Sequence, residues 1–168
     1  MTFHKIEDGY TYGTFIPGPD NPWGEQARDM VCHESSILSP AELAADRWGA
    51  VTFQALGMTR PDASGLDPGV TFYGLGTERQ LMTVASITEE GDNNMHIPNS
   101  VELTRLVTMP IYRNRGFATS LLNWMEDICV ADKITSIVAM YGDSADYEFY
   151  RKRGYKQLAP QTVIRHIA

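Results

Sequence analysis

The stretch Ile111–Leu122, IYRNRGFATSLL, places two arginines and a glycine directly before an apolar, helix-like run. The start of a helix leaves backbone N–H groups without intrahelical partners, and the helix dipole adds positive character there. Gly116 allows a ligand to approach the backbone, and Arg113 and Arg115 can donate charge-assisted hydrogen bonds. These features predict an anion-binding turn. A structural strand-to-helix turn with two solvated arginines would show the same pattern, so the residues alone leave both interpretations open.

On both sides of this turn, hydrophobic spacing and turn formers predict an ordered series of elements. Ser39 and Glu42 form a capping box at one helix start. The order is helices, an antiparallel meander, and then alternating strands and helices, which predicts an α/β (α+β) fold with one central mixed sheet flanked by helices. Helices are expected at 23–33, 39–56, 116–130 and 143–153, and strands at 70–75, 80–88, 101–108, 134–140, 155–158 and 162–167.

Length and composition restrict the class of protein. The 168 residues are expected to form a single domain spanning 1–168, with 43% hydrophobic and 21% charged residues, as in ordinary globular proteins. A net charge of −7 argues against general nucleic-acid binding, which needs a basic face. The N-terminal segment lacks the pattern of a signal peptide, and no apolar run is long enough to span a membrane. A cytoplasmic location is therefore expected.

The two cysteines make neither a disulfide framework nor a zinc site. Cys129 falls on the apolar side of a helical pattern, which predicts a packed thiol. Cys32 precedes His33, and such a pair could supply a nucleophile. Because no third, orienting group is visible in the sequence, the nucleophile interpretation is not favoured.

The anion-binding turn resembles a motif of the GCN5-related N-acetyltransferase (GNAT) superfamily. Arg113-Asn114-Arg115-Gly116-Phe117-Ala118 matches the pattern Q/R-x-x-G-x-G/A. Upstream, Leu106–Tyr112 stands where many members carry L-x-V-x-P-x-Y, with Thr108 in place of the valine. Downstream, Asp143–Tyr155 aligns without gaps with N-x-x-A-x-x-L-Y-x-x-x-G-F. The resemblance covers residues 101–158.

The resemblance implies a sheet with two strands splayed apart to admit the pantetheine arm of acetyl-CoA, or of another acyl-CoA. Backbone groups of Leu106, Val107 and Thr108 would pair with that arm. Backbone N–H groups would hold the pyrophosphate, assisted by Arg113 and Arg115. Asp143 replaces the usual asparagine of the second motif, which places a negative charge near an anionic ligand. The implied pyrophosphate residues are Asn114, Arg115, Gly116, Phe117, Ala118 and Thr119.

Acyl transfer to an amine poses two proton problems. An ammonium group with a pKa near 10.4 is neutral in only about one molecule in a few thousand at pH 7, so a base is needed. The departing thiolate gains from an acid. Tyr150 stands where many relatives carry this acid, although a core tyrosine would fit its position too. Glu102 lies where histone-acetyltransferase members carry a catalytic glutamate; a solvated glutamate, a water or His96 as base are the alternatives.

The resemblance implies an N-acetyltransferase that moves an acetyl group to a primary amine of a small molecule or protein. The acceptor would enter near 33–36 (His33, Glu34, Ser35, Ser36), with Trp23 and Trp48 nearby in sequence. Ordinary loop polarity and packed tryptophans would explain those residues equally well. Two alternatives stay open: a non-catalytic acyl-CoA-binding or partner-binding module, and an unrelated phosphate ligand. A homodimer is a further possibility, and no metal is expected.

Overall fold

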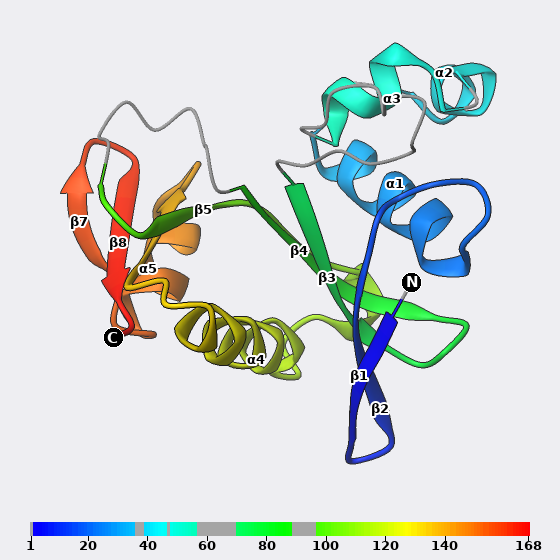
Figure 1. Ribbon diagram of the computed structural model, residues 1–168. Helices are drawn as coiled ribbons and strands as arrows, with labels where there is room; N and C mark the ends of the chain where they lie inside the picture. The colour runs from blue at the N-terminus through cyan, green and yellow to red at the C-terminus, as the bar shows by residue number, and fades with distance from the viewer. Residues whose placement is uncertain (1, 36–38, 47, 57–69, 89–96) are drawn as a thin grey trace.

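The computed structural model describes residues 2–35, 39–46, 48–56, 70–88 and 97–168 (Figure 1). In this part of the chain eight strands form one sheet in the order β1-β2-β3-β4-β5-β6-β8-β7. Only the central β5–β6 pair is parallel, and the other neighbours are antiparallel. The strands are β1 Thr2–Glu7, β2 Tyr10–Phe15, β3 Val70–Gly76, β4 Leu81–Thr88, β5 Ser100–Thr108, β6 Ser136–Met140, β7 Lys156–Ala159 and β8 Thr162–His166.

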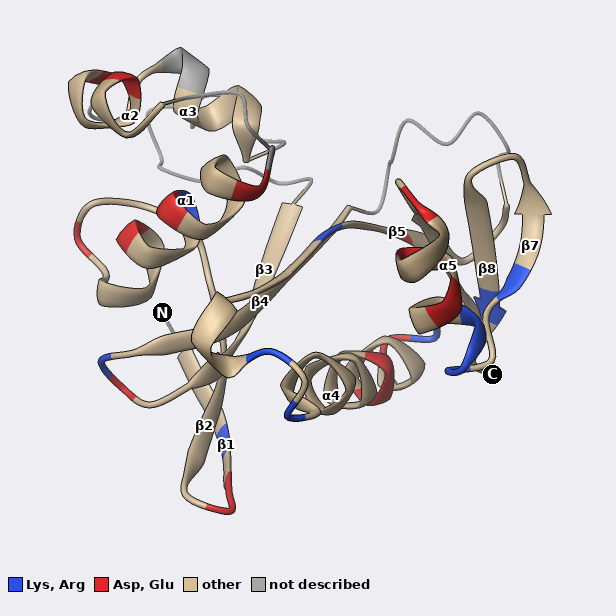
Figure 2. Cartoon of the chain, turned by 180° about the vertical axis from the view of Figure 1, so that it is seen from behind, with Lys and Arg blue, Asp and Glu red and all other residues tan. Residues whose placement is uncertain are grey.

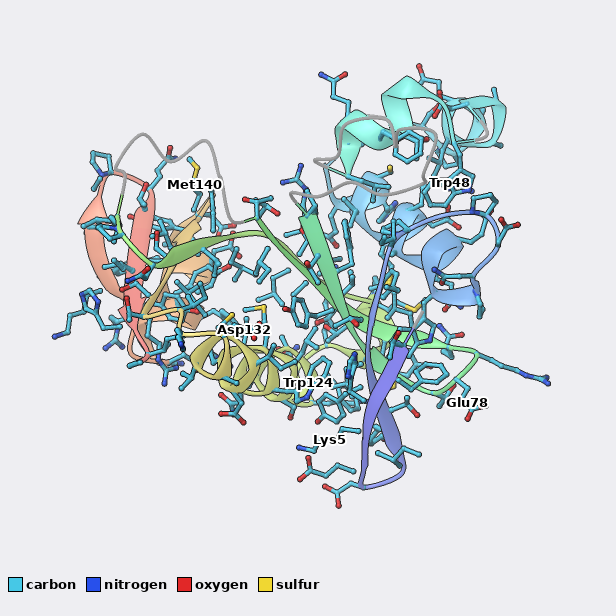
Figure 3. The ribbon with its side chains drawn as sticks, viewed as in Figure 1. Lys5, Trp48, Glu78, Trp124, Asp132 and Met140 are labelled. Carbon is cyan, nitrogen blue, oxygen red and sulfur yellow. The ribbon has the colours of Figure 1, made fainter. Side chains whose placement is uncertain are left out.

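Helices cover both faces of this sheet, which confirms the predicted α/β class with a mixed central sheet. Successive strand residues point to opposite faces. Phe72 and Val84 therefore join a core with α1 and α3, whereas Tyr73 and Ala85 join a core with α4. Figure 3 shows Trp124 projecting from α4 toward the β1–β2 hairpin. The helices are α1 Pro22–Ser35, α2 Pro40–Asp46, α3 Ala50–Ala55, α4 Phe117–Ala131 and α5 Ser144–Arg151, with a 3₁₀ turn η1 at Pro110–Tyr112.

The β1–β2 hairpin was not predicted, because the expected strands begin only at residue 70. Asp8 and Gly9 both have positive φ, 52° and 81°, as a two-residue type I′ turn requires. An Asp-Gly pair between alternating residues is a strong hairpin signal, so this element was detectable in the sequence. The hairpin extends the sheet beyond β3 and supplies Tyr12 to the core under α4.

The single helix expected at 39–56 is wrong, since two helices occupy this range. Trp48 adopts a positive φ of 65°, which ends the first helix. The Asp46 carboxylate then accepts hydrogen bonds from the N–H groups of Gly49 (3.0 Å) and Thr52 (2.9 Å), which caps the second. The capping box is confirmed: Ser39 N–H donates to Glu42 Oε2 at 2.7 Å.

Both cysteines are buried thiols, as predicted for Cys129. Cys32 and Cys129 are buried, and burial raises the pKa of each thiol, that of Cys129 to about 11. His33, in contrast, is exposed. A thiol with a raised pKa inside the core is a poor nucleophile, so the Cys32–His33 hypothesis fails. Among the described helices, none is long and apolar enough to cross a bilayer.

Candidate active site

The site begins where the two parallel strands separate. β5 and β6 pair from Ser100 to Leu103, opposite Ser136 to Ala139. β5 then continues to Thr108, still paired with β4 but with no described strand along its other edge. The register with β4 skips Thr104, which marks a β-bulge one residue beyond the last β5–β6 pair. A bulge bends its strand and increases its twist, which accounts for the separation at this point.

The separated part of β5 presents backbone hydrogen-bonding groups to the open edge. Peptide groups alternate in direction along a strand. The Val107 carbonyl faces β4, where it accepts a hydrogen bond from Thr83 Oγ1 at 3.1 Å. The backbone groups of Leu106 and Thr108 must therefore face the open edge, and the Thr108 carbonyl accepts from Arg113 Nε there at 3.1 Å. An extended ligand can add to such an edge as an extra strand.

The separation opens a cleft with a volume of about 970 Å³. This size is at the upper end of the usual range for ligand pockets. One wall is β5 and the end of α1, another is the start of α4, and a third is α5. The lining comprises Val31, Glu34, Leu103, Thr104, Arg105, Leu106, Val107, Thr108, Tyr112, Arg113, Asn114, Gly116, Phe117, Ala118, Thr119, Met140, Gly142, Ala145, Asp146, Phe149, Tyr150 and Arg153.

The first turn of α4 brings unpaired backbone donors to this cleft. The first helical hydrogen bond runs from Ser120 N–H to the Gly116 carbonyl at 3.0 Å. The N–H groups of Phe117, Ala118 and Thr119 consequently have no acceptor within the helix. Gly116 caps the helix with a φ of 82°, which favours glycine, while a Cβ there would meet no described atom within 4 Å. Backbone conformation rather than crowding therefore selects glycine.

The two arginines of the turn have different surroundings. Arg113 lines the cleft and forms an ion pair with Glu34, at the end of α1. Arg115 does not line the cleft; its guanidinium lies 6.0 Å from the ring centre of Tyr112. Figure 2 shows basic residues at the loop before α4 and around the end of α5, and acidic residues on α1 and α5. Arg113 is the better placed of the pair to contact an anion.

Arg153 is a cleft residue that the sequence did not reveal. Its Nε donates to Thr119 Oγ1 at 2.8 Å, its Nη1 to the Phe149 carbonyl at 2.6 Å, and its Nη2 also to Thr119. The guanidinium lies 3.5 Å from the ring centre of Phe149. The side chain thus reaches from the end of α5 to the first turn of α4. The only sequence signal is a basic residue beside Gly154, which many solvated surfaces share.

Tyr150 is one of the buried residues that line the cleft. It is 7% exposed and packs edge-on against Phe149 and Tyr155, with ring centres 5.3 and 5.1 Å away. Burial, and then the charge of Asp146, raise the pKa of the Tyr150 hydroxyl well above its usual range, against a smaller opposing effect of Arg153. The phenol is therefore protonated throughout the neutral range and can donate a proton or a hydrogen bond to a group in the cleft.

Besides Arg115, two predicted site residues do not line the cleft. Glu102 is 6% exposed on the paired part of β5, while its neighbours Val101 and Leu103 point into the core under α4. Asp143 is the N-cap of α5, where its carboxylate accepts a hydrogen bond from Asp146 N–H at 2.9 Å. Asp143 therefore caps α5, and its contact with the cofactor stays a prediction. Glu102 could reach the cleft only through an intervening group.

On the acceptor side, only Glu34 of the named residues lines the cleft. Trp23 is fully buried and donates to the Thr77 carbonyl, and Trp48 donates to Glu25, so both tryptophans are structural. His33 lines a separate groove between α1 and α2. Ser36 and His96 lie outside the described residues, as does the side chain of Ser35. Met140, 62% exposed, marks the end of β6 (Figure 3).

A family model described as "Acetyltransferase (GNAT) family" matches residues 41–155. The chain belongs to this acetyltransferase family. The matched range includes the splayed strands, the start of α4 and Tyr150, so the GNAT resemblance of the sequence is confirmed. A search of curated proteins finds no match. Within the described residues, no group of three His, Cys, Asp or Glu side chains could hold a metal ion.

Solved structures show the same fold at low identity. The chain is similar to PaiA N-acetyltransferase from Thermoplasma acidophilum in complex with coenzyme A (18% identity, 91% of this chain and 96% of that one, TM-score 0.57). It is also similar to aminoglycoside 6'-acetyltransferase type Ii (18%, 94% and 97%, TM-score 0.64) and to a putative N-acetyltransferase from Lactobacillus plantarum (17%, 95% and 99%, TM-score 0.64). Identities this low support the GNAT fold and leave the acceptor undetermined.

Proposed function

We propose that this protein transfers an acetyl group from acetyl-CoA to a primary amine of a small molecule or protein. One observation carries the proposal: the open edge of β5, the first turn of α4 and the buried Tyr150 all line one cleft. The same cleft thus combines an extended backbone edge, an anion-binding helix start and a proton donor. Membership of the GNAT family supports each of these roles.

The cleft residues fit the donor chemically. A pantetheine arm carries amide groups, which suit the backbone groups of Leu106 and Thr108 that face the open edge of β5. A pyrophosphate suits the unpaired N–H groups at the start of α4, together with the charge of Arg113. The backbone from Asn114 to Thr119 is the proposed pyrophosphate cradle. Acetyl-CoA supplies the acetyl group as an activated thioester.

The chain's own residues handle the protons. In the overall reaction a C–N bond forms and the C–S bond of the thioester breaks. The ammonium loses two protons, one to the base and one that balances the proton given to the departing sulfur. Tyr150 is the proposed proton donor to the departing sulfur, and its raised pKa keeps the hydroxyl protonated at neutral pH. Glu102 is the proposed base. Because Glu102 does not line the cleft, it would take the amine proton through an intervening water.

Thermal unfolding with acetyl-CoA, and with ATP as a control, tests donor binding. A ligand at about a hundred times its Kd adds about 2.7 kcal/mol to the free energy of unfolding. For a chain of this size the midpoint should rise by about 5–10 °C. A shift with acetyl-CoA alone, followed by thiol release with a panel of amines, supports the enzyme. A shift without thiol release would support a non-catalytic module, and a larger shift with ATP would contradict both.

Glu34→Gln should tighten acetyl-CoA binding about two- to fivefold. The Arg113–Glu34 pair is about half exposed, and such pairs contribute about 0.2–1 kcal/mol. A phosphate must compete with Glu34 for Arg113, so removal of the carboxylate charge frees the guanidinium for the ligand. Asp29→Asn is the matched control, because it removes the same charge from the same helix outside the cleft. Calorimetry that gives weaker or unchanged binding for Glu34→Gln would remove Arg113 from the donor site.

A further inference from the structure

The guanidinium of Arg153 lies at the first turn of α4, directly beside the unpaired backbone donors. Two of its nitrogens donate to Thr119 Oγ1, and Thr119 belongs to that turn. A helix start and a fixed arginine at one place both favour an anion. Neither feature depends on the other, because the arginine comes from the opposite wall of the cleft, at the end of α5.

The hydrogen bonds of Arg153 within the protein leave some of its N–H donors unused. A guanidinium carries five N–H donors, and the three hydrogen bonds described above do not use all of them. Contact with the face of Phe149 fixes its plane. Among the described residues no carboxylate forms an ion pair with Arg153; Asp146, on the same wall, faces the Gly142 N–H at 3.4 Å. A half-buried, pre-oriented cation without a counter-ion gains most from an anionic ligand.

We propose that Arg153 binds a phosphate group of the acyl-CoA donor at the first turn of α4 and thereby fixes the donor's position in the cleft. This inference rests on the proposed function. Arg153 is a specificity-determining residue in this scheme, because it distinguishes phosphorylated donors from simple thioesters. Both the pyrophosphate and the 3′-phosphate of coenzyme A offer the required chemistry.

Calorimetric titration of three proteins with coenzyme A tests the proposal. Arg153→Gln should weaken coenzyme A binding about 10- to 100-fold, since it removes a charge-assisted contact. Lys152→Gln is the matched control, because Lys152 is the exposed neighbour of Arg153 and carries the same charge. The Kd of this variant should stay within twofold of the wild type. Arg153→Lys keeps the charge without the planar fork, so its affinity should lie between those of Arg153→Gln and the wild type.

Dephospho-coenzyme A then identifies the phosphate. If Arg153 contacts the 3′-phosphate, Arg153→Gln should leave dephospho-coenzyme A binding unchanged; if it contacts the pyrophosphate, both ligands should lose affinity equally. Unliganded melting temperatures separate a lost ligand contact from a damaged fold, and Arg153→Lys serves if Arg153→Gln does not fold. If Arg153→Gln binds coenzyme A as tightly as the wild type, the proposal is overturned while the proposed function stands. If only Arg153→Lys folds, equal affinity of that variant and the wild type has the same meaning. No binding to the wild type overturns both.

Discussion

Tyr150→Phe is expected to lower kcat about 100- to 10,000-fold, the usual contribution of a positioned general acid. The substitution removes one hydroxyl from the buried part of the cleft and keeps the ring that packs between Phe149 and Tyr155. The backbone edge and the α4 start are untouched, so the Kd for acetyl-CoA should stay within about threefold. Thiol release with an amine that the wild type accepts measures kcat, and calorimetry measures Kd.

Tyr147→Phe is the control for this substitution. Tyr147 lies on the same helix, packs against Tyr141 at 5.2 Å and does not line the cleft. Loss of its hydroxyl should leave kcat unchanged. If Tyr150→Phe retained the wild-type kcat, Tyr150 would be a core tyrosine, which is the alternative that the sequence left open.

The pH dependence follows from the direction of the Tyr150 pKa. The acid works only while protonated, and burial raises its pKa above the usual value near 10. Activity should therefore persist as pH rises through the neutral range, and any decline that belongs to Tyr150 should begin above about pH 10. Glu102→Gln should lower kcat, because it removes the proposed base; an unchanged kcat would point to another base.

The part of the proposed donor site that sequence motifs predict best is the part that depends on backbone conformation. Gly116 is constrained by its positive φ, and the N–H groups after it require only that a helix begin at Phe117. A short motif records such constraints because few residue types satisfy them. Arg153 could not be predicted in this way. Its place in the cleft depends on the angle between α5 and α4, which is set by packing between segments 34 positions apart.

The separation of β5 from β6 also depends on contacts between distant segments that the sequence does not reveal. The sequence predicts β5 as a strand, and the GNAT resemblance predicts that it parts from a neighbour. The bulge at Thr104 depends on register with β4, and the Thr104 hydroxyl pairs there with Ser86 Oγ at 2.8 Å. Pairing of this kind joins distant segments and leaves no local pattern. The β1–β2 hairpin is a different case, since Asp8-Gly9 was a local signal that pattern analysis overlooked.

Ala118→Glu is expected to weaken acetyl-CoA binding at least about 100-fold while leaving the unliganded protein as stable as the wild type or slightly more so. Ala118 lines the cleft at the second position of α4, where its N–H has no helical acceptor. A glutamate near a helix start is favourable by about 0.3–1 kcal/mol. The same carboxylate would repel a pyrophosphate, and two like charges about 4 Å apart near a protein surface cost about 4 kcal/mol.

The opposite signs of these two effects make the experiment decisive. A variant that merely disturbed α4 would lose stability and binding together, whereas Ala118→Glu should lose binding alone. Ala41→Glu provides the matched control, since Ala41 is the second residue of α2 and exposed, outside the cleft. It adds the same charge at an equivalent helix position and should keep the wild-type Kd. If Ala118→Glu bound acetyl-CoA as tightly as Ala41→Glu, the anion at this turn could not be the donor's pyrophosphate, and the strand-to-helix turn would be structural.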